Sequence, residues 1–392
     1  MPFTARGSVP SPKPHRTVLF LQGPPTAFWN DLARAVRAEG AAIRRINLCF
    51  ADRLFWREGH AVDYRGSLRG WRHWLKAYLA REGVTDIVYF ADRLPYHRIA
   101  RVLAGQQGIG AHAVEFGYLR PDWLTLERGG NGAYSHISAD PADLPDGVLP
   151  DLRARYGHPF WQEALGEVLY NLAMVAGRPI SPRYVMDKPV HPVPDYLAWL
   201  LKIVRAPARN RRARQVQTAV LAWCPFWLAG LQLPVDYQLR DGADYADQRA
   251  MVEAVVASFA QHAPAGDALL FKAHPLDNGW VDWAAVARRA ARKHDVEDRV
   301  TGIDGGDLGM LINASRGVVV ANSTVGLLAL RHGKPVKTLG AAIYDMPGLT
   351  AQAPLDGFWQ TPSPPDPVLV ERLIARSEER CVGKECATGC RS

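Results

Sequence analysis

Long apolar runs, an export signal and paired cysteines are all missing from this sequence. No stretch reaches the roughly 18 consecutive apolar residues of a membrane-spanning helix, and the polar start at residues 1–16 lacks the apolar centre of a signal peptide. Before the last residues the only cysteines are Cys49 and Cys224, both in apolar surroundings, which is typical of reduced intracellular thiols. We therefore expect a cytoplasmic protein that is soluble or peripheral to a membrane.

The net charge favours an anionic partner, and the absence of known motifs argues against nucleic acid and dinucleotides. The 47 Lys and Arg residues exceed the 39 Asp and Glu residues, and the formal net charge of +8 fits an anionic partner. No zinc-finger or RNA-recognition motif accompanies the charge, so we expect no nucleic acid. The turn at Gln22–Pro25 lacks the GxGxxG pattern, which argues against a dinucleotide site.

Residues 376–392 differ sharply in composition from the rest of the chain. They contain Cys381, Cys386 and Cys390, whose spacing matches no zinc pattern and lacks a second knuckle. The run RSEER-VGKEC closely resembles the translation of a short-read sequencing adapter. We interpret this segment as an artefact, exclude it from the fold prediction and expect no metal site.

The length of 392 residues suits two α/β domains. In the first part of the chain, short apolar strands alternate with amphipathic helices, which is typical of a parallel sheet with helices on both faces. Strands are predicted at 17–21, 43–48, 86–90 and 111–114, and helices at 28–39, 71–81 and 97–105. We predict that residues 16–149 form a Rossmann-like acceptor and catalytic domain.

The middle of the chain has a different character. Residues 150–214 are rich in Trp, Leu and Arg and interrupted by prolines, so we predict a helical insert and connector. Alternation then resumes, with strands predicted at 219–223, 268–271, 317–321 and 336–339, and helices at 245–262, 283–294 and 325–332. Residues 215–375 are predicted to form a Rossmann-like nucleotide-binding domain. Two such α/β halves joined by a connector describe the GT-B architecture, with ligands in a cleft at the carboxyl ends of strands.

The motif FKAHP places polar residues directly after a buried strand. Lys272 and His274 are two positions apart, so they can point to the same side and donate to one phosphate. Pro275 follows them. The alternative is that His274 caps the next turn and Lys272 is solvated, and the motif alone favours neither.

A second motif joins the strand at 317–321 to a helix through Asn322, Ser323 and Thr324. Ser and Thr are good helix N-caps, and free N–H groups at a helix N-terminus also bind phosphate. We expect this strand end and that of Lys272 to be near neighbours in the sheet, so the two motifs would form one site.

The run AHAVEFGYLRPDWLTLERGGNGAYS, residues 111–135, is too long for a simple connection. Glu115 ends an apolar strand, Gly117 permits a tight turn, and a loop in which Glu115 pairs with Arg120 is the plainer interpretation. Further polar candidates in this run are Asp122, Glu127 and Asn131.

Two other segments have both a plain and a functional interpretation. Asp92, Arg93 and His97 follow the third strand and can face the cleft, although a helix cap and a surface histidine are the favoured interpretation. The basic run 202–214 follows YLAWLL at 196–201, a combination found on anionic membrane surfaces and equally in solvated linkers.

Several of these motifs occur together and in order in one known family. The start VLFLQGPPTAFWNDLA, the run EFGYLRPDWLTLERGGNGAYS, FKAHP, and NSTVGLLAL followed by GKPVKTLGAAIYDMPGLT resemble the capsule polysaccharide biosynthesis/export family, in its KpsS/LipB branch, over residues 16–360. The resemblance implies a retaining β-Kdo transferase that uses CMP-Kdo and builds a Kdo linker on a phosphatidylglycerol-type lipid. The expected location is peripheral, on the inner face of the inner membrane, with other capsule assembly or export proteins as further partners.

The resemblance also implies roles for individual residues. The HP-containing motif is similar to the CMP-binding motif of bacterial sialyltransferases, so Lys272, His274 and Pro275 would hold the CMP phosphate with help from Ser323 and Thr324. A Lys, a His and a helix N-terminus can neutralise this single phosphate without a metal or other cofactor.

The catalytic residues implied are Glu115 and Arg120. Retention calls for a carboxylate nucleophile, which we assign to Glu115, and Arg120 can grip the Kdo carboxylate with two hydrogen bonds. The family often has two adjacent acidic residues at this point, and here Phe116 replaces the second. That departure keeps open a non-catalytic assembly or export factor, and a GT-B transferase for another CMP-sugar, such as a sialyltransferase, is the other alternative.

Overall fold

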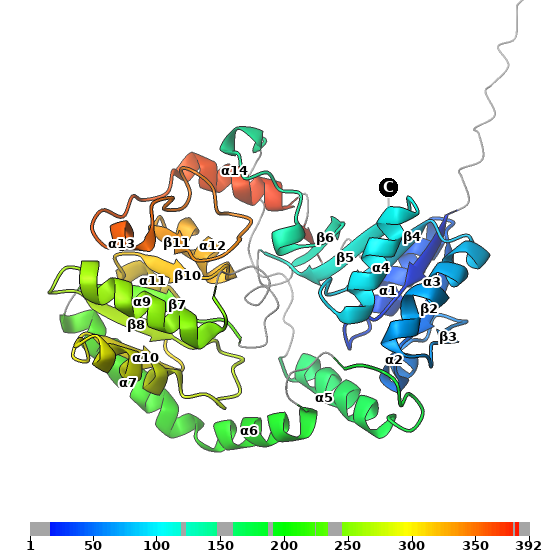
Figure 1. The fold of residues 1–392 in the computed structure, drawn as a ribbon, viewed down its shortest axis with the longest axis horizontal. Coiled ribbons are helices and arrows are strands. Elements are labelled where there is room, and N and C mark those ends of the chain that lie inside the picture. The colour runs from blue at the N-terminus through cyan, green and yellow to red at the C-terminus, as the bar shows by residue number, and fades with distance from the viewer. Residues whose placement is uncertain are drawn as a thin grey trace, which may run out of the picture. The chain divides into compact units, whose positions relative to one another are not determined.

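The computed structural model describes residues 16–118, 123–146, 160–186, 191–223, 225–233, 245–378 and 381–383 (Figure 1). The chain divides into two compact units. Unit 1 contains the described residues up to His112 together with 160–185, and unit 2 contains those of 113–159 and 186–384. The boundary falls inside one strand, β5.

The first sheet has seven strands in the order β12-β6-β5-β4-β1-β2-β3. The strands are β1 Thr17–Phe20, β2 Ala42–Asn47, β3 Val62–Asp63, β4 Asp86–Phe90, β5 Gly110–Phe116, β6 Trp123–Arg128 and β12 Cys381–Gly383. The helices of unit 1 are α1 Phe28–Ala38, α2 Phe50–Phe55, α3 Leu68–Glu82, α4 Pro95–Gln106 and α5 Phe160–Ala176.

Strand β1 is central because parallel partners, β2 and β4, flank it on both sides. All four of its side chains are buried, as expected for a strand covered on both faces. Helix α3 shows how local sequence sets the element ends: Ser67 accepts a hydrogen bond from the Gly70 amide at its start, and Gly83 closes it in a left-handed conformation with φ +60°.

The second sheet has five strands, all parallel, in the order β11-β10-β7-β8-β9. The strands are β7 Phe226–Gly230, β8 Ala268–Lys272, β9 Val300–Ile303, β10 Val318–Val320 and β11 Val336–Thr338. The helices of unit 2 are α6 Pro192–Val204, α7 Ala206–Trp223, α9 Gln248–His262, α10 Trp283–Lys293, α11 Leu308–Ala314, α12 Thr324–Arg331, α13 Leu355–Phe358 and α14 Pro367–Glu378.

The core of unit 2 has two layers, one on each face of this sheet. Alternate residues of a strand point to opposite faces, and β7 shows this directly. Phe226 and Leu228 belong to one buried cluster, and Trp227 and Ala229 belong to the other. The predicted α/β class with two Rossmann-like halves is confirmed.

Most predicted elements occur within a few residues of their predicted bounds, with one clear error. The strand predicted at 219–223 is wrong, because these residues form the last turns of α7, and the strand is β7 at Phe226–Gly230. A short apolar run cannot be assigned to a strand or a buried helix by periodicity alone. Here Ala213 and Val220 are two turns apart and both pack into the core, as helical spacing requires.

The units differ from the predicted segments 16–149, 150–214 and 215–375. The expected connector is divided, since α5 belongs to unit 1 whereas α6 and α7 belong to unit 2. The segment after His112 also belongs to unit 2: Leu144 lies in its core, and the Arg372 side chain of α14 hydrogen-bonds the Leu144 carbonyl.

The segment interpreted as an artefact starts inside an ordered helix. Helix α14 continues to Glu378, and Leu373 and Ile374 near its end are buried in the core. Beyond it, β12 pairs antiparallel with β6 over three residues, Cys381 to Gly383.

We expect that deleting residues 379–392 leaves the stability of the protein nearly unchanged, because only three described residues there pair with the sheet. Leu373→Ala is the matched control. This side chain is fully buried, and the cavity should lower the free energy of unfolding by about 2–5 kcal/mol. Chemical denaturation measures both. A deletion as damaging as Leu373→Ala would show that the tail is part of the fold.

Candidate functional site

The second sheet brings the ends of three neighbouring strands to one edge. Gly230, the last residue of β7, lies opposite Lys272 of β8 on one side and Val320 of β10 on the other. From β7 the chain continues to β8 and β9 and then returns to β10 and β11 on the opposite side. The order of strands therefore reverses between β7 and β10. Open α/β sheets bind ligands outside the carboxyl ends of strands at such a switch point.

Lys272 is a buried lysine at this edge. It is 6% exposed, and within the described part of the chain its ammonium group makes no hydrogen bond. Its pKa lies below the ordinary 10.5, mainly because burial removes water from the charge; Lys202 lowers it further, and Asp304 and Asp307 oppose the shift. An ammonium group held without a hydrogen-bonding partner is suited to receive an anion.

The loop after β8 is built around His274. The Nδ1 atom of His274 accepts a hydrogen bond from the Leu276 amide at 3.1 Å, and the Asp277 amide donates to the His274 carbonyl at 3.0 Å. The plainer interpretation, in which His274 caps the next turn, therefore describes one of its contacts. The other part of that alternative, a solvated Lys272, is wrong, because the strand carries this residue into the buried edge. Pro275 is exposed.

Lys202 of α6 holds the same loop from outside. Its ammonium group donates to the carbonyl oxygens of Asp277 and, at 3.4 Å, of Pro275, and lies 3.2 Å from a carboxylate oxygen of Asp304. Lys202 is 7% exposed. A lysine expected to belong to a solvated or membrane-facing basic run is therefore a buried contact of this loop.

The second motif forms the N-terminus of α12. Ser323 is its N-cap, as the residue type predicts, and its hydroxyl accepts from the Val325 amide at 3.2 Å. Thr324 is the first helical residue. The Tyr344 hydroxyl donates to the Ser323 carbonyl at 2.5 Å and fixes the turn. The Gly326 amide also donates to the Ser323 carbonyl, at 2.9 Å, so the first turn of this helix is closed on its N-cap.

The strand ends of the two motifs lie in one sheet, with a single strand between them. Strand β7 lies between β8 and β10, so Gly230 separates Lys272 from the turn at Asn322. Gln232, just after β7, spans part of this interval. Its amide nitrogen donates to the Asn322 side-chain oxygen at 2.8 Å, and its backbone amide donates to Gln248 at 3.1 Å.

Sequence reasoning missed Gln232, although a signal was present. A polar residue directly follows the wholly apolar run FWLAGL, as Lys272 follows ALLF. Because the strand was predicted at 219–223, Gln232 was not recognised as a residue that follows a strand end in the way Lys272 does. Buried polar side chains at successive strand ends are the pattern that would have found it.

The candidate nucleophile Glu115 lies near the end of β5 and is half-buried, and the neighbouring Phe116 is 52% exposed. Gly117 was expected to permit a tight turn, but its role is a close approach. Its amide donates to the Trp123 carbonyl at 2.8 Å, and a Cβ there would lie 2.6 Å from the Trp123 side chain. Arg120 and Asp122 lie outside the described residues.

Glu127 is a second carboxylate in the same region. It is 1% exposed, and its two oxygens accept hydrogen bonds from the Tyr118 hydroxyl at 3.1 Å and the Ser135 hydroxyl at 2.7 Å. Burial, and then the charge of Glu127, raise the pKa of Tyr118. Asn131 nearby in sequence is fully buried. Glu127 is therefore an organising group of the loop, whereas Glu115 is the more accessible carboxylate.

The favoured interpretation of Asp92, Arg93 and His97 is wrong. All three are buried, and the N-cap of α4 is Leu94, with no side-chain cap. His97 lies on the inner face of α4 against the Tyr89 ring, and its Nδ1 is 2.8 Å from the Ala91 carbonyl. Burial lowers the pKa of His97 to about 4, so it is neutral at physiological pH. Asp92 and Arg93 form an ion pair at 3.4 Å.

Unit 1 also contains a buried polar network that sequence reasoning missed. Arg45 of β2 pairs with Asp52 of α2 at 3.3 Å, and the Tyr170 hydroxyl of α5 donates to Asp52 at 2.7 Å. Gln22, after β1, donates to the hydroxyls of Tyr170 at 2.5 Å and Tyr184 at 3.1 Å. The network lies at the carboxyl ends of β1 and β2, and a sequence gives no signal for a partner as distant as Tyr170.

Among the residues that the structure describes, no group of three or more His, Cys, Asp and Glu side chains is arranged to hold a metal ion. In the same part of the chain, no helix is long and apolar enough to cross a membrane.

Known proteins resemble this chain in both structure and sequence. KpsC from Thermosulfurimonas dismutans, a β-Kdo 2,7 transferase, aligns with 94% of this chain and 97% of its own at 13% identity and a TM-score of 0.44. KpsS of Escherichia coli, a capsule polysaccharide export protein, is 31% identical over 373 residues, which cover 91% of this chain and 92% of that protein. LipB of Neisseria meningitidis serogroup B, a capsule polysaccharide modification protein, is 32% identical over 365 residues, with coverage of 89% and 86%.

The profile of one family, described as capsule polysaccharide biosynthesis protein, matches residues 85–377. This range includes Glu115, Lys272, His274 and the turn at Asn322 to Thr324. The family profile and the two relatives that align over most of the chain agree, and this protein belongs to the capsule polysaccharide biosynthesis family, with KpsS and LipB among its relatives.

Proposed function

We propose that this protein is a glycosyltransferase of capsule assembly that transfers Kdo, with retention, from CMP-Kdo to a phosphatidylglycerol-type lipid at the inner face of the membrane. The donor and acceptor follow from the family resemblance of the sequence motifs. The single observation that carries the proposal is the buried ammonium group of Lys272 at the switch point of the second sheet.

The proposed donor site matches the charge that develops on the leaving group. The phosphate of a CMP-sugar gains negative charge as its bond to the sugar breaks, and a desolvated ammonium group stabilises that charge more strongly than water does. Lys272 supplies the ammonium group, and the N-terminus of α12, capped by Ser323, supplies the positive end of the helix dipole. In the proposed arrangement Gln232 and Asn322, already joined at 2.8 Å, line the floor between them.

Glu115 is the proposed nucleophile because it is accessible and belongs to the same unit as Lys272. Its carboxylate would form a bond to the anomeric carbon while the bond from that carbon to the CMP phosphate oxygen breaks and CMP leaves with the electron pair. A hydroxyl of the lipid acceptor would then displace Glu115 and lose its proton. Two inversions give net retention.

One observation favours a second candidate, a non-catalytic factor that binds the donor or the lipid-linked product. Phe116 occupies the position where the family often has a second acidic residue, and its ring is 52% exposed. The proposed transferase requires that Glu115 alone suffices, which the variants below test.

We expect that Lys272→Met abolishes the CMP-induced rise in melting temperature. The melting temperature without CMP should not fall, because burial disfavours the charge that the substitution removes. His274→Ala should weaken the CMP effect, and UDP should stabilise the wild type less than CMP. Lys293→Ala, which removes an exposed lysine paired with Glu253, is the control and should behave as wild type. An unchanged CMP effect in Lys272→Met would contradict the assignment.

The lowered pKa of Lys272 predicts a pH dependence of CMP binding. Affinity should decline as pH rises through this pKa, below the 10.5 of an ordinary lysine, because the neutral amine no longer attracts phosphate. Without ligand the sign is opposite: the folded state binds fewer protons than the unfolded state, so this residue's contribution to stability increases over the same pH range. Calorimetric titration at several pH values measures the first effect. Lys272→Arg stays charged and should lose the alkaline decline, and an identical decline in this variant would exclude Lys272 as its source.

We expect that Glu115→Gln loses about a thousandfold or more in transfer rate and keeps CMP binding, because an amide is too weak a nucleophile to form the intermediate. With acceptor withheld, wild type should show a Kdo-sized mass increase on the peptide that contains Glu115. Glu253→Gln, which changes a glutamate of α9 paired with Lys293, is the control. Near-normal turnover of Glu115→Gln would move the nucleophile to another residue.

A further inference from the structure

Helix α6 is amphipathic, but its apolar face points to the solvent and polar side chains face the protein. The side chains that face the protein include Lys202, which is 7% exposed, and Asp195, which accepts a hydrogen bond from the Asn278 side chain at 2.6 Å. The outward side chains are aliphatic and between 48% and 71% exposed: Val193, Leu197, Leu200, Leu201, Ile203 and Val204. Five of them, at positions 193, 197, 200, 201 and 204, recur at the spacing of a single helical face.

The polar contacts of α6 fix this orientation. Lys202 holds the carbonyls of Pro275 and Asp277 and the carboxylate of Asp304, so turning the helix to bury its leucines would leave these groups without their cation. Surface helices of soluble proteins normally bury the apolar face. An apolar face that a buried lysine holds outward is suited to contact with an apolar phase.

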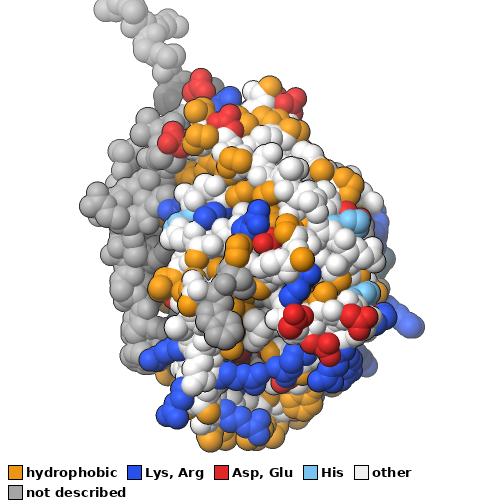
Figure 2. All heavy atoms as spheres, turned by 90° about the vertical axis from the view of Figure 1, so that its left-hand side faces the viewer, with side chains coloured by type: hydrophobic (Ala, Val, Ile, Leu, Met, Phe, Trp, Pro, Cys, Tyr) orange, Lys and Arg blue, Asp and Glu red, His pale blue; other side chains and the backbone are white. Residues whose placement is uncertain are grey.

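The chain next to this face carries uncompensated positive charge. Residues 196–223 contain six Lys and Arg residues and no Asp or Glu. Within the described part of the chain, none of the exposed arginines here forms an ion pair: Arg205, Arg211, Arg212 and Arg214. Figure 2 shows Lys and Arg side chains in a band across the lower part of this face, at the height where Figure 1 draws α7 and α10.

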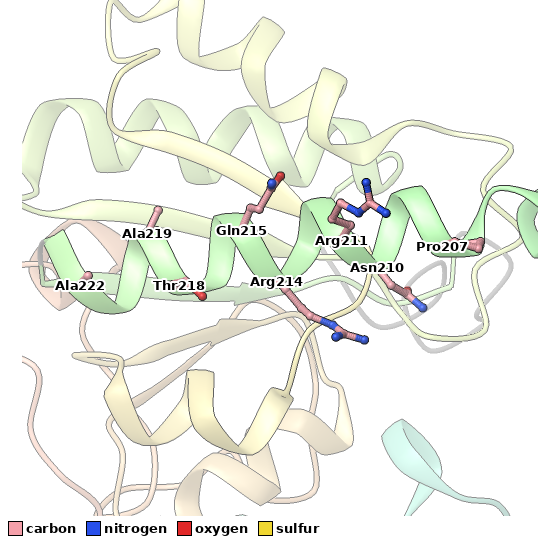
Figure 3. A pocket seen from close by; sticks show the side chains of 8 residues that line it. All are labelled: Pro207, Asn210, Arg211, Arg214, Gln215, Thr218, Ala219 and Ala222. Atoms are coloured by element: carbon pink, nitrogen blue, oxygen red, sulfur yellow. The ribbon is translucent and has the colours of Figure 1, made fainter.

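The exposed side of α7 is open as well as basic. Within the described part of the chain, the residues that line a shallow surface hollow here belong to α7, among them Arg211, Arg214 and Thr218. In Figure 3 the side chains of Arg211 and Arg214 extend to opposite sides of the helix. Guanidinium groups displayed in this way can each reach a separate phosphate.

We propose that α6 and the adjoining half of α7 form a docking surface for an anionic lipid bilayer. The aliphatic face of α6 would lie at the depth of the acyl chains and the arginines of α7 at the headgroup phosphates. At thirteen residues, α6 is too short to cross a bilayer and would lie along it. The inference deepens the proposed function, because it assigns the surface through which a lipid acceptor would be reached.

The charges favour a bilayer over a second copy of this chain. A symmetric dimer through this surface would set the same unpaired arginines against one another, and like charges at an interface repel. An anionic bilayer offers acyl chains to the apolar face and negatively charged headgroups to the arginines.

The test is co-sedimentation with vesicles of phosphatidylcholine alone or mixed with phosphatidylglycerol. Wild type should bind the mixed vesicles, more weakly as salt rises, and bind phosphatidylcholine poorly. Leu197→Ser/Leu200→Ser/Val204→Ser and, separately, Arg211→Glu/Arg214→Glu should each lose about tenfold or more in affinity. Both should keep the wild-type melting temperature, because the altered side chains are exposed.

Matched controls place the same changes elsewhere on the surface. Leu54→Ser/Val102→Ser/Val368→Ser removes exposed apolar side chains, and Arg289→Glu/Arg331→Glu reverses exposed charges on α10 and α12. Both should bind mixed vesicles as wild type does. Control variants that lose as much affinity as the α6 and α7 variants, or wild type that ignores mixed vesicles, would overturn the inference. So would self-association of wild type that the leucine substitutions abolish.

CMP stabilisation measured without vesicles keeps this test separate from the proposed function. Loss of vesicle binding with an intact CMP effect would overturn the docking surface alone. Vesicle binding in a protein that CMP does not stabilise would overturn the donor site and leave the docking surface standing.

Discussion

The buried ammonium group of Lys202 is the contact on which the rest of unit 2 depends. It joins α6 to the loop after β8 and to Asp304 after β9, so one cation fixes two loops at the carboxyl edge of the sheet. Lys272, at the switch point of the same sheet, makes no hydrogen bond within the described residues. The Lys202 contact also turns the aliphatic face of α6 outward. The contacts of Lys202 therefore stabilise both the loop beside the proposed donor site and the orientation of α6 in the proposed membrane surface.

Unit 1 uses a similar device. The Arg45–Asp52 ion pair lies next to the carboxyl ends of β1 and β2, and Tyr170 attaches α5 to it. Burial raises the pKa of Tyr170 well above 10, so its hydroxyl remains a donor at any physiological pH. In each unit a buried charged group holds a helix from the middle of the chain: Asp52 binds α5 through Tyr170, and Lys202 binds α6 to the loops of the second sheet. This explains why the segment predicted as one connector is divided between the units.

The sequence predicts what depends on local pattern and misses what depends on distant partners. Strands β1, β4 and β8 were predictable because their apolar runs are short and bounded, and Ser323 because N-caps have a residue signature. The strand at 219–223 failed because a short apolar run also fits a helix end. His97 was misjudged because the exposure of a histidine depends on what its helix packs against, here the Tyr89 ring. Of the candidate site, the Lys272 and Asn322–Thr324 motifs were identified from sequence, whereas Gln232 between them was missed because the preceding strand was predicted at 219–223.

A transfer reaction with defined components tests the central claim most directly. Wild-type protein would be incubated with CMP-Kdo generated in the reaction and a fluorescent phosphatidylglycerol, and the lipid product analysed by mass spectrometry. We expect a lipid whose mass increases by one Kdo residue, with release of CMP. Unmodified lipid in the presence of a protein that CMP still stabilises would contradict the transferase and support a factor that binds the donor without catalysis.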